Sequence, residues 1–342
     1  MNRSILIAVA ASLAALFSSC KTIQASVAIN PSVSLTLLDA DIVFSCNGNG
    51  KTGLYLMNIA SGAVTEFVKP QLGSIHNPSI SCDGKSIEYL FAENNNGKAL
   101  FYFATTSLKS GGITKVFQFE RPVSTITVSS CEDLIYFTSA QYFGHSSPIN
   151  RPSAKMMELY TVSRAGKNVQ RVSNFGAYVI GGDLHLEKNS NEIYLNLIFD
   201  KDNLPDGPYK YNLSSKTLTY LVPSNMNEIH PGVEKDFNRD FYITQLVPIP
   251  TNKSETVLLK GAYIIYALDV AKKFGRIIHE QQQNSRYKFS NTIRSLEAFH
   301  NSRDCLFFKE DSLFGSFVIV KDNGEEIKIP VDMAAFEKHF YD

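Results

Sequence analysis

Five polar residues of this sequence have types and a spacing that could do chemistry. His76 and His230 lie at the same offset, eleven residues, before a residue of a predicted strand, and Asn77 follows the first of them. Asp183 falls near the equivalent place in another segment, and His185 is two residues further on. Imidazole and carboxylate groups are standard ligands, so this set could bind a metal or an anionic ligand. The sequence therefore predicts a ligand-binding site at His76, Asn77, Asp183 and His230, and a wet polar surface without a ligand is the alternative.

No motif of a known catalytic mechanism is present in the sequence. It contains no Gly-x-Ser-x-Gly turn, no His-Glu-x-x-His pair, no Cys-x-x-Cys pair and no glycine-rich phosphate loop. The acidic stretch 200–207 is similar to a calcium loop, but Leu204 and Pro205 stand where the EF-hand spacing needs a ligand and a glycine. We therefore predict a surface loop there, and we predict no catalytic residue, no dedicated metal site and no cofactor.

The first twenty residues have the pattern of an export signal. A basic start precedes an apolar run that ends at Phe17 and is too short for a membrane span. Residues 16–20, Leu-Phe-Ser-Ser-Cys, resemble a bacterial lipobox. The resemblance implies that residues 1–19 are a lipoprotein signal peptide and that Cys20 becomes the lipidated, palmitate-bearing N-terminus. An ordinary secretory signal is the alternative, and Lys21 favours the outer membrane over the inner one.

Composition limits the partners of the chain. The 33 Lys and Arg residues balance the 33 Asp and Glu residues, and no run of five or more basic residues occurs. Nucleic acid is therefore not an expected partner, because phosphate binding needs a surplus of basic side chains on one face. The small, polar segment 20–34 is predicted to be a tether after the lipidated cysteine. Residues 333–342 are predicted to form a short amphipathic helix.

Short strands separated by turns dominate the rest of the chain. The clearest example runs from Asn77 to Tyr89 and consists of a strand, an Asp-Gly turn and a second strand. Units of about 45 residues repeat this pattern in six segments with four strand-like runs each. We therefore predict an all-β fold, a six-bladed β-propeller of four-stranded antiparallel blades over residues 35–332. A blade count that differs by one, a β-solenoid and two β-sandwiches are the alternatives.

Two short motifs connect this repeat with a known family. Ser-x-Asp-Gly-Lys at 81–85 precedes an apolar-aromatic strand, and Leu-Tyr-x-x-Asn at 54–58 precedes a glycine turn. They resemble the TolB-type propeller repeat, which occurs in periplasmic TolB and in propellers attached to prolyl-oligopeptidase-type peptidases. The resemblance implies that His76 starts an innermost strand, so that the candidate ligand residues lie at the mouth of a central channel. It carries little information about function.

Four cysteines remain after Cys20, namely Cys46, Cys82, Cys131 and Cys305. An exported chain can oxidise them, and four cysteines allow three pairings between which the sequence does not choose. Cys46 and Cys305 lie in the first and last units, which are neighbours in a closed ring. A disulfide clasp between them is therefore one hypothesis, and small buried apolar side chains are the other.

Export, lipidation and a ring of strands together predict a function in the bacterial cell envelope. We expect a membrane-anchored, non-enzymatic propeller scaffold that binds a protein, a peptide or a glycan through one mouth of the ring. The alternative is a hydrolase or lyase built from loops, which would act on polysaccharide with carboxylates and with His76 or His230 at the channel mouth. The enzyme hypothesis needs two acids, or a histidine and an acid, that face one cavity.

Overall fold

The computed structural model describes residues 32–38, 41–48, 50–129, 132–144, 153–186, 191–199, 204–225, 228, 243, 245–249, 255–261, 263–280, 293–299, 304–311 and 314–331. All of them belong to one compact unit, Ser32–Asp342. Cys20, most of the expected tether and the expected helix at 333–342 lie outside the described residues. In the part of the chain that the structure describes, no helix is long and apolar enough to cross a membrane.

The first twelve strands form three groups of four in which each strand pairs antiparallel with the next. The first group is β1 (Ser32–Leu38), β2 (Asp41–Gly48), β3 (Lys51–Asn58) and β4 (Val64–Leu72), the second is β5 (Ser74–Ile80), β6 (Ser86–Asn95), β7 (Lys98–Ser107) and β8 (Gly111–Gln118), and the third is β9 (Ile126–Val128), β10 (Leu134–Gly144), β11 (Ser153–Ser163) and β12 (Gln170–Arg171).

The remaining twelve strands repeat this antiparallel order in three further groups. They are β13 (Ala177–Leu186), β14 (Glu192–Phe199), β15 (Gly207–Asn212) and β16 (Thr217–Tyr220), then β17 (Gln245–Ile249), β18 (Thr256–Lys260), β19 (Ile264–Asp269) and β20 (Phe274–Glu280), and finally β21 (Ile293–Ala298), β22 (Cys305–Asp311), β23 (Phe314–Val320) and β24 (Glu326–Val331). Antiparallel four-stranded units are therefore confirmed.

Single residue pairs join three of these groups into one sheet of twelve strands, whereas the other three groups remain separate sheets. Met157 of β11 pairs with Ala177 of β13, and Asp183 of β13 pairs in parallel with Gln245 of β17. The parallel pair shows that the first strands of neighbouring groups run in the same direction.

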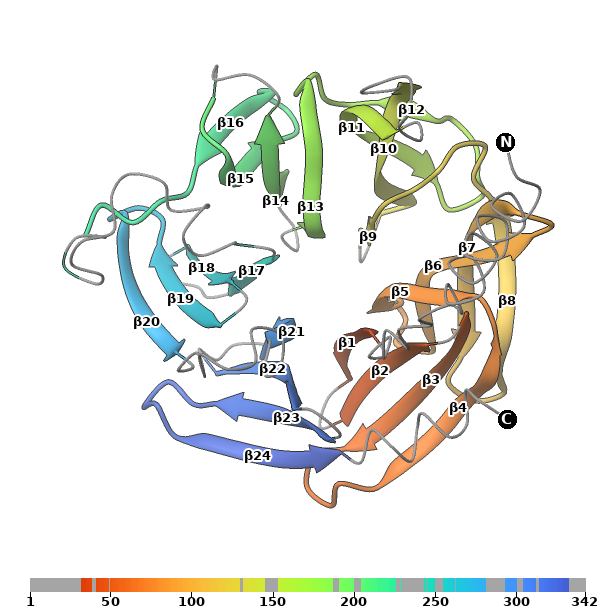
Figure 1. The fold of residues 1–342 in the computed structure, drawn as a ribbon, viewed down its shortest axis with the longest axis horizontal. Coiled ribbons are helices and arrows are strands. Elements are labelled where there is room, and N and C mark those ends of the chain that lie inside the picture. Colours follow the sequence, from red (N-terminus) through yellow and green to blue (C-terminus); the bar gives the residue numbers. More distant parts are fainter. Residues whose placement is uncertain are drawn as a thin grey trace, which may run out of the picture. The chain divides into compact units, whose positions relative to one another are not determined.

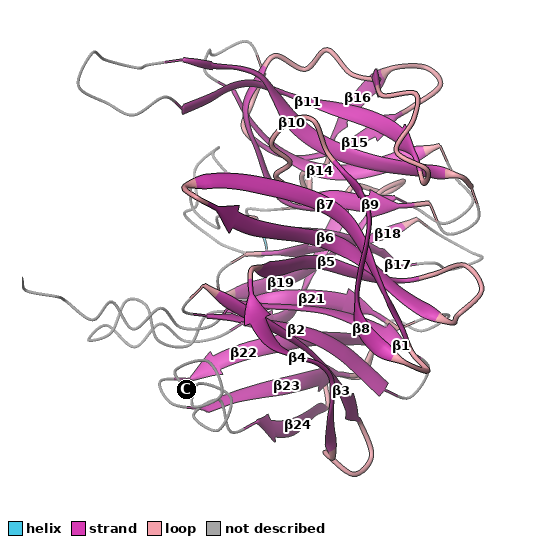
Figure 2. Ribbon diagram, turned by 90° about the vertical axis from the view of Figure 1, so that its right-hand side faces the viewer, coloured by secondary structure: helices cyan, strands magenta, loops and turns pink. Residues whose placement is uncertain are grey.

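The first strands of the groups surround a common centre (Figure 1). β1, β5, β9, β13, β17 and β21 each contact the first strand of the next group, and β21 returns to contact β1. Each first strand pairs along one edge with the second strand of its group, so its other edge faces the centre. Figure 2 shows the same groups from the side, with strands that run between the two faces of the ring. The centre is therefore bordered by strand edges whose peptide groups need partners.

Apolar cores fill the spaces between neighbouring groups, because both faces of each group carry apolar side chains. The core between the first and last groups closes the ring. There Phe44 of β2 packs against Phe317 of β23, with ring centroids 5.2 Å apart, and Phe317 packs against Phe308 of β22 at 5.1 Å. Full burial of one such ring contributes about 1.5–3 kcal/mol. Among the described strands, side-chain packing makes this closure, since β1 pairs with β2 and β24 pairs with β23.

The structure adds two details about the start of the first strand and about the cysteines. β1 begins at Ser32, three residues before the expected start of the propeller at residue 35, and its alternating Val33 and Leu35 are buried in the closing core. Cys46 and Cys305 are both buried, but they belong to different cores, and Cys305 is a free thiol. The structure therefore contains no clasp between these two residues. Cys82 is exposed, and Cys131 lies outside the described residues.

Candidate functional site

A cavity of about 170 Å³ lies where the first strands meet, and every one of the six contributes to its wall. The wall consists of Ser34, Leu35, Thr36, Asn77, Pro78, Ser79, Ile126, Thr127, Leu184, His185, Gln245, Ser295 and Glu297. The volume exceeds the ~10–15 Å³ that one buried water needs. It is smaller than the ~300 Å³ of the smallest pockets for drug-sized ligands. A single small group can therefore enter.

Most residues that line this cavity have polar side chains. Leu35, Ile126 and Leu184 belong to the apolar cores between the groups. The polar residues of the wall are five hydroxyl side chains, two amides, one imidazole and one carboxylate: Ser34, Thr36, Ser79, Thr127, Ser295, Asn77, Gln245, His185 and Glu297. None of the described residues of this wall is Lys or Arg. The cavity thus offers many donors and acceptors and no described basic side chain.

Asn77 is held at the wall by an irregularity in β5. Its φ of 49° is in the left-handed region, which asparagine tolerates better than most residues. The register of β5 against β6 shifts between His76 and Ser79 at the same place. The Asn77 Oδ1 accepts hydrogen bonds from the Thr125 Oγ1 at 3.0 Å and from the Ile126 N–H at 3.3 Å. The amide therefore links the second group to the third at the edge of the cavity.

Gln245 fixes the opposite part of the wall. Its Nε2 donates to the Leu296 carbonyl at 2.9 Å, and its Oε1 accepts from the Leu296 N–H at 2.9 Å. These two bonds leave no freedom to exchange the oxygen and the nitrogen of the amide. Nε2 is therefore the atom that faces the Nε2 of His185 at 3.4 Å. An amide nitrogen only donates, so this contact is a hydrogen bond when the His185 Nε2 carries no proton.

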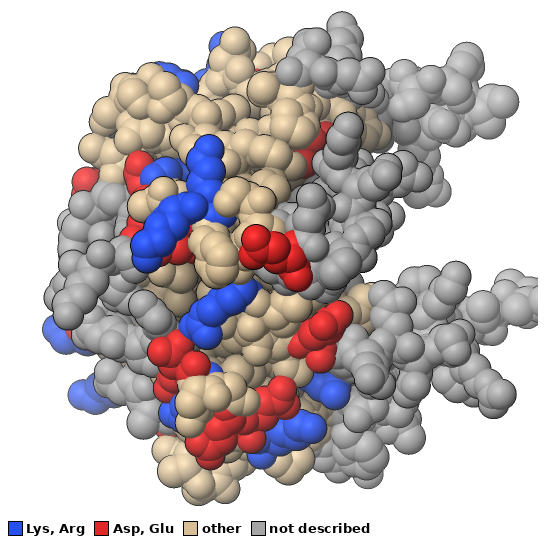
Figure 3. Space-filling view, turned by 90° about the vertical axis from the view of Figure 1, so that its left-hand side faces the viewer, with Lys and Arg blue, Asp and Glu red and all other residues tan. Residues whose placement is uncertain are grey.

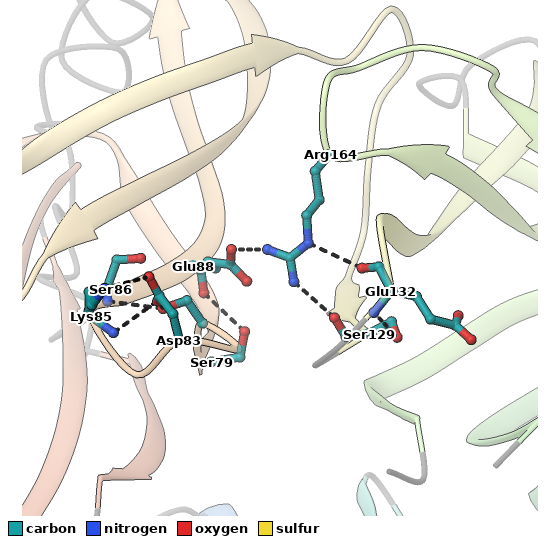
Figure 4. A network of polar contacts seen from close by, with 9 residues as sticks. Ser79, Asp83, Lys85, Ser86, Glu88, Ser129, Glu132 and Arg164 are labelled. Atoms are coloured by element: carbon teal, nitrogen blue, oxygen red, sulfur yellow. Dashed lines mark hydrogen bonds and ion pairs between the residues drawn. The ribbon is translucent and has the colours of Figure 1, made fainter. Parts of the chain in front are cut away.

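The end of β5 that carries Ser79 is held by a polar network between the second and third groups (Figure 4). Ser79 Oγ donates to the Glu88 carbonyl at 3.3 Å, and the Glu88 carboxylate pairs with the Arg164 guanidinium. Arg164 also donates to the Ser129 and Glu132 carbonyls at 2.9 and 3.3 Å. Burial raises the pKa of the Glu88 carboxyl above its usual value, and the charge of Arg164 opposes part of this shift. The network thus reaches the cavity wall through Ser79 and positions the end of β5.

The Asp-Gly turn beside this network forms as the sequence predicts. Gly84 has a φ of 67°, a conformation that costs glycine little. The Asp83 carboxylate accepts from Ser81 Oγ at 2.7 Å and from the Lys85 N–H at 3.0 Å, which lowers its pKa. These bonds fix the length of the β5–β6 connection and hence the register of β5.

The predicted site residues have different positions in the structure. Asn77 lines the cavity. His76 is half-buried outside the described wall, where its Nε2 contacts the Ser74 Oγ at 2.9 Å. Asp183 is described by its backbone, which pairs with Gln245. His230 lies outside the described residues.

The equal offset that selected His230 beside His76 stays a prediction, because His230 and residue 241 both lie outside the described residues. The second strand that the structure describes in that group is β18, Thr256–Lys260. Sequence reasoning missed Gln245, Ser295 and Glu297 as wall residues. The signal that could have identified Gln245 is the start of β17, which the sequence pattern does not mark.

The described residues contain no cluster of three or more His, Cys, Asp or Glu side chains that could hold a metal ion. The cavity does bring His185 and Glu297 to one wall. An imidazole and a carboxylate are the side chains that most often accept and donate protons in enzymes. The arrangement can therefore bind hydroxyl and amide groups, and it contains one pair of side chains of the kind that acid–base chemistry uses.

Outside the cavity, charges of both signs are mixed. Figure 3 shows Lys and Arg beside Asp and Glu over one side of the ring. At the interface of the last two groups, Arg276 Nη2 pairs with Asp322 at 2.6 Å, and His279 Nδ1 contacts Glu326 at 2.7 Å. Such exposed pairs contribute about 0–1 kcal/mol each. No large field of one sign covers the described part of this side.

The sequence matches no protein-family profile and no curated protein. Solved structures are similar to it. TolB from Acinetobacter baumannii has 11% identity and a TM-score of 0.58 over 86% of this chain and 64% of that chain. This chain thus spans less than two thirds of that protein. The nidogen/laminin complex follows with 10% identity and a TM-score of 0.55, over 87% of this chain and 92% of that one.

A third similar structure is an oligogalacturonate lyase in complex with manganese. It has 12% identity and a TM-score of 0.51, over 84% of this chain and 73% of that one. At these identities the likeness concerns the fold alone. Together with the antiparallel sheets around a common centre, the comparisons show that this chain has a TolB-like β-propeller fold.

Proposed function

We propose that this protein is a binding protein of the bacterial cell envelope, anchored by a lipid at Cys20 and built on a six-bladed propeller. The observation that carries the proposal is the polar cavity to which all six first strands contribute. A rigid ring holds these groups in place before a ligand arrives, so binding requires little ordering of the protein. The protein recognises a group of a peptide, protein or glycan partner in this cavity.

Two features support a count of six blades. The first strands form a cycle of six contacts, and one apolar core separates each consecutive pair of groups. The pairs that join three groups into one sheet involve one residue of each strand and leave the meander of each group intact. Each group of four strands thus corresponds to one blade.

The anchor rests on the sequence of residues 16–20, which resembles a lipobox. Residues 20–31 precede β1 and supply a tether between the lipid and the ring. Fractionation of cells that produce the full chain tests this part. The expected result is that the wild type is found in the outer membrane and the Cys20→Ala variant is not. A wild type that remains in the soluble periplasmic fraction would overturn the anchor.

Capture from a detergent extract of the envelope tests the binding function. Thr36 lies on the cavity wall, and Thr114 on β8 is exposed outside it. A tyrosine at position 36 should fill the cavity, and a tyrosine at position 114 is the matched control. The proposal expects that the wild type and Thr114→Tyr retain a component of the extract and that Thr36→Tyr does not. All three proteins should show the same thermal unfolding. Equal retention by all three would place recognition elsewhere on the protein.

A second candidate function is supported by His185 and Glu297, which line the same cavity. A histidine and an acid that face one cavity are what a polysaccharide hydrolase or lyase would need. Incubation of the full chain with envelope polysaccharides, followed by analysis of reducing ends and of unsaturated products, tests it. Turnover that disappears in Glu297→Gln and in His185→Ala, while ligand retention persists, would establish the enzyme. Retention without turnover leaves the binding function.

A further inference from the structure

We propose that the ligand of the central cavity is a neutral, hydroxyl-rich group, namely one uncharged sugar unit of a glycan. The inference rests on the binding function proposed above and specifies its ligand class. It follows from the chemistry of the wall, from the size of the cavity and from the way in which the amides of the wall are held.

The wall presents donors and acceptors together. Each first strand offers the peptide groups of its inner edge, where N–H and C=O alternate along the chain. Five of the residues that line the cavity carry a hydroxyl side chain, and a hydroxyl both donates and accepts. An ion of either sign would meet groups of the wrong polarity at half of these positions. A sugar hydroxyl satisfies both kinds of position, because it can rotate to donate to a carbonyl or to accept from an N–H.

The charges of the described wall disfavour an acidic ligand. Glu297 is its carboxylate, and no described wall residue is Lys or Arg. The Gln245 Nε2 lies 3.4 Å from the His185 Nε2, and this contact is a hydrogen bond when the imidazole is neutral with an unprotonated Nε2. A phosphate or a uronic acid would therefore lack the basic partners that anion sites use. The proposed ligand therefore differs from an acidic oligosaccharide because it carries no charge.

The size of the cavity favours one compact unit over an extended segment. Its volume of about 170 Å³ is below that of pockets for drug-sized molecules. An extended peptide advances about 3.3 Å for each residue, so a segment of several residues would extend beyond the cavity. A single sugar ring carries several hydroxyls in a compact shape, so one unit can contact several first strands at once.

Titration calorimetry with the full chain in detergent tests this inference. The neutral probes are cellotriose, mannotriose and triacetylchitotriose, the acidic probe is trigalacturonate, and the peptide probe is trialanine. The variants are Thr36→Val and Thr127→Val, which remove one hydroxyl of the wall each while keeping the side-chain shape. Thr114→Val is the control on the outer strand β8. Thermal unfolding verifies that each variant is folded.

The proposal expects at least one neutral probe to bind with a Kd below about 1 mM. Each cavity variant should weaken that binding about three- to tenfold, as expected for the loss of one neutral hydrogen bond, and the control should not. Binding that both cavity variants leave unchanged would overturn the proposal. Binding of trigalacturonate or trialanine in place of the neutral probes would overturn the ligand class and leave the binding function standing. Absence of all binding, together with failed capture from the envelope, would overturn both.

Discussion

The side-chain amide of Gln245 pairs with both backbone groups of Leu296, as a neighbouring strand would. Its Nε2 donates to the Leu296 carbonyl and its Oε1 accepts from the Leu296 N–H, each at 2.9 Å. Gln245 is 3% exposed, so water cannot replace these bonds. One side chain thereby connects β17 to β21 and also defines which of its atoms faces His185. Gln245 therefore contributes both to the stability of the ring and to the chemistry of the cavity.

Replacement of Gln245 by leucine should destabilise the protein and weaken ligand binding. The Leu296 N–H and carbonyl would lose buried partners, which costs about 2–5 kcal/mol of the free energy of unfolding. Asn225 is the matched control, because its amide pairs in the same way with Gly275 at 2.9 and 2.8 Å outside the cavity. Urea unfolding should show a similar loss for Asn225→Leu. Ligand affinity should fall for the Gln245 variant only, and an equal fall in both would contradict the assignment.

The His185 ring should be in one tautomer. Because the Gln245 amide can only donate to the His185 Nε2, the neutral imidazole should carry its proton on Nδ1. Nitrogen-15 NMR of histidine-labelled protein near pH 8 distinguishes a protonated from an unprotonated ring nitrogen. The expected spectrum has an unprotonated Nε2 for His185, and Gln245→Glu, which replaces the donor by an acceptor, should move the proton to Nε2. A protonated Nε2 in the wild type would contradict this geometry.

Glu88 should make stability fall as the pH rises from the acid range. Burial raises the pKa of its carboxyl in the folded state above the usual value near 4.5. At a pH below the pKa of the unfolded state, the carboxyl is protonated in both states, and its contribution to the free energy of unfolding is fully present. As the pH rises, the carboxyl ionises first in the unfolded state. The contribution to stability is therefore lost as the pH rises through the pKa of the folded state.

Urea unfolding of the wild type and of Glu88→Gln at pH 4 and pH 7 measures this effect. The free energy of unfolding of the wild type minus that of the variant should be smaller at pH 7 than at pH 4. An increase from pH 4 to pH 7 would mean that the pair with Arg164 outweighs burial, contrary to the expected direction.

The cysteines should differ in reactivity. Burial raises the pKa of the Cys305 thiol to about 12, and the side chain is inaccessible, whereas Cys82 is exposed. Thiolates are the reactive form, so iodoacetamide at pH 8 should modify Cys82 in the native protein and Cys305 after unfolding without a reductant. Peptide mass spectrometry reads both positions. A Cys305 that stays unmodified after unfolding until a reductant is added would instead reveal a disulfide.

Much of the fold can be predicted from the sequence, because turns and alternating apolar residues are local signals. The Asp-Gly turn at residues 83–84 forms as expected, and strands β2, β3, β6 and β7 coincide with clear apolar-aromatic runs. The innermost strands are harder to recognise. β9 has three residues, and β17 begins at a glutamine, so neither has the length or pattern of a typical strand.

The cavity is less predictable, since side-chain direction depends on register. A shift between His76 and Ser79 brings Asn77 to the wall, and a second shift between Gly181 and His185 precedes the place where His185 reaches it. A residue displaced by one position along a strand faces the opposite side. Two of the segments that the sequence singled out, in β5 and β13, contribute Asn77 and His185 to the cavity wall. The register shifts determine which side chain faces the cavity, and these shifts have no local signal in the sequence.

The side-chain amide resonances of Asn77, Gln245 and Asn225 test most directly whether the centre of the ring is the binding site. The measurement is a nitrogen–proton spectrum of the labelled full chain, recorded with and without the envelope component or neutral saccharide that the wild type retains. The account predicts that the signals of Asn77 and Gln245, which line the cavity, shift, and that the signal of Asn225, which lies outside it, does not. Binding that leaves the Asn77 and Gln245 signals in place would contradict it.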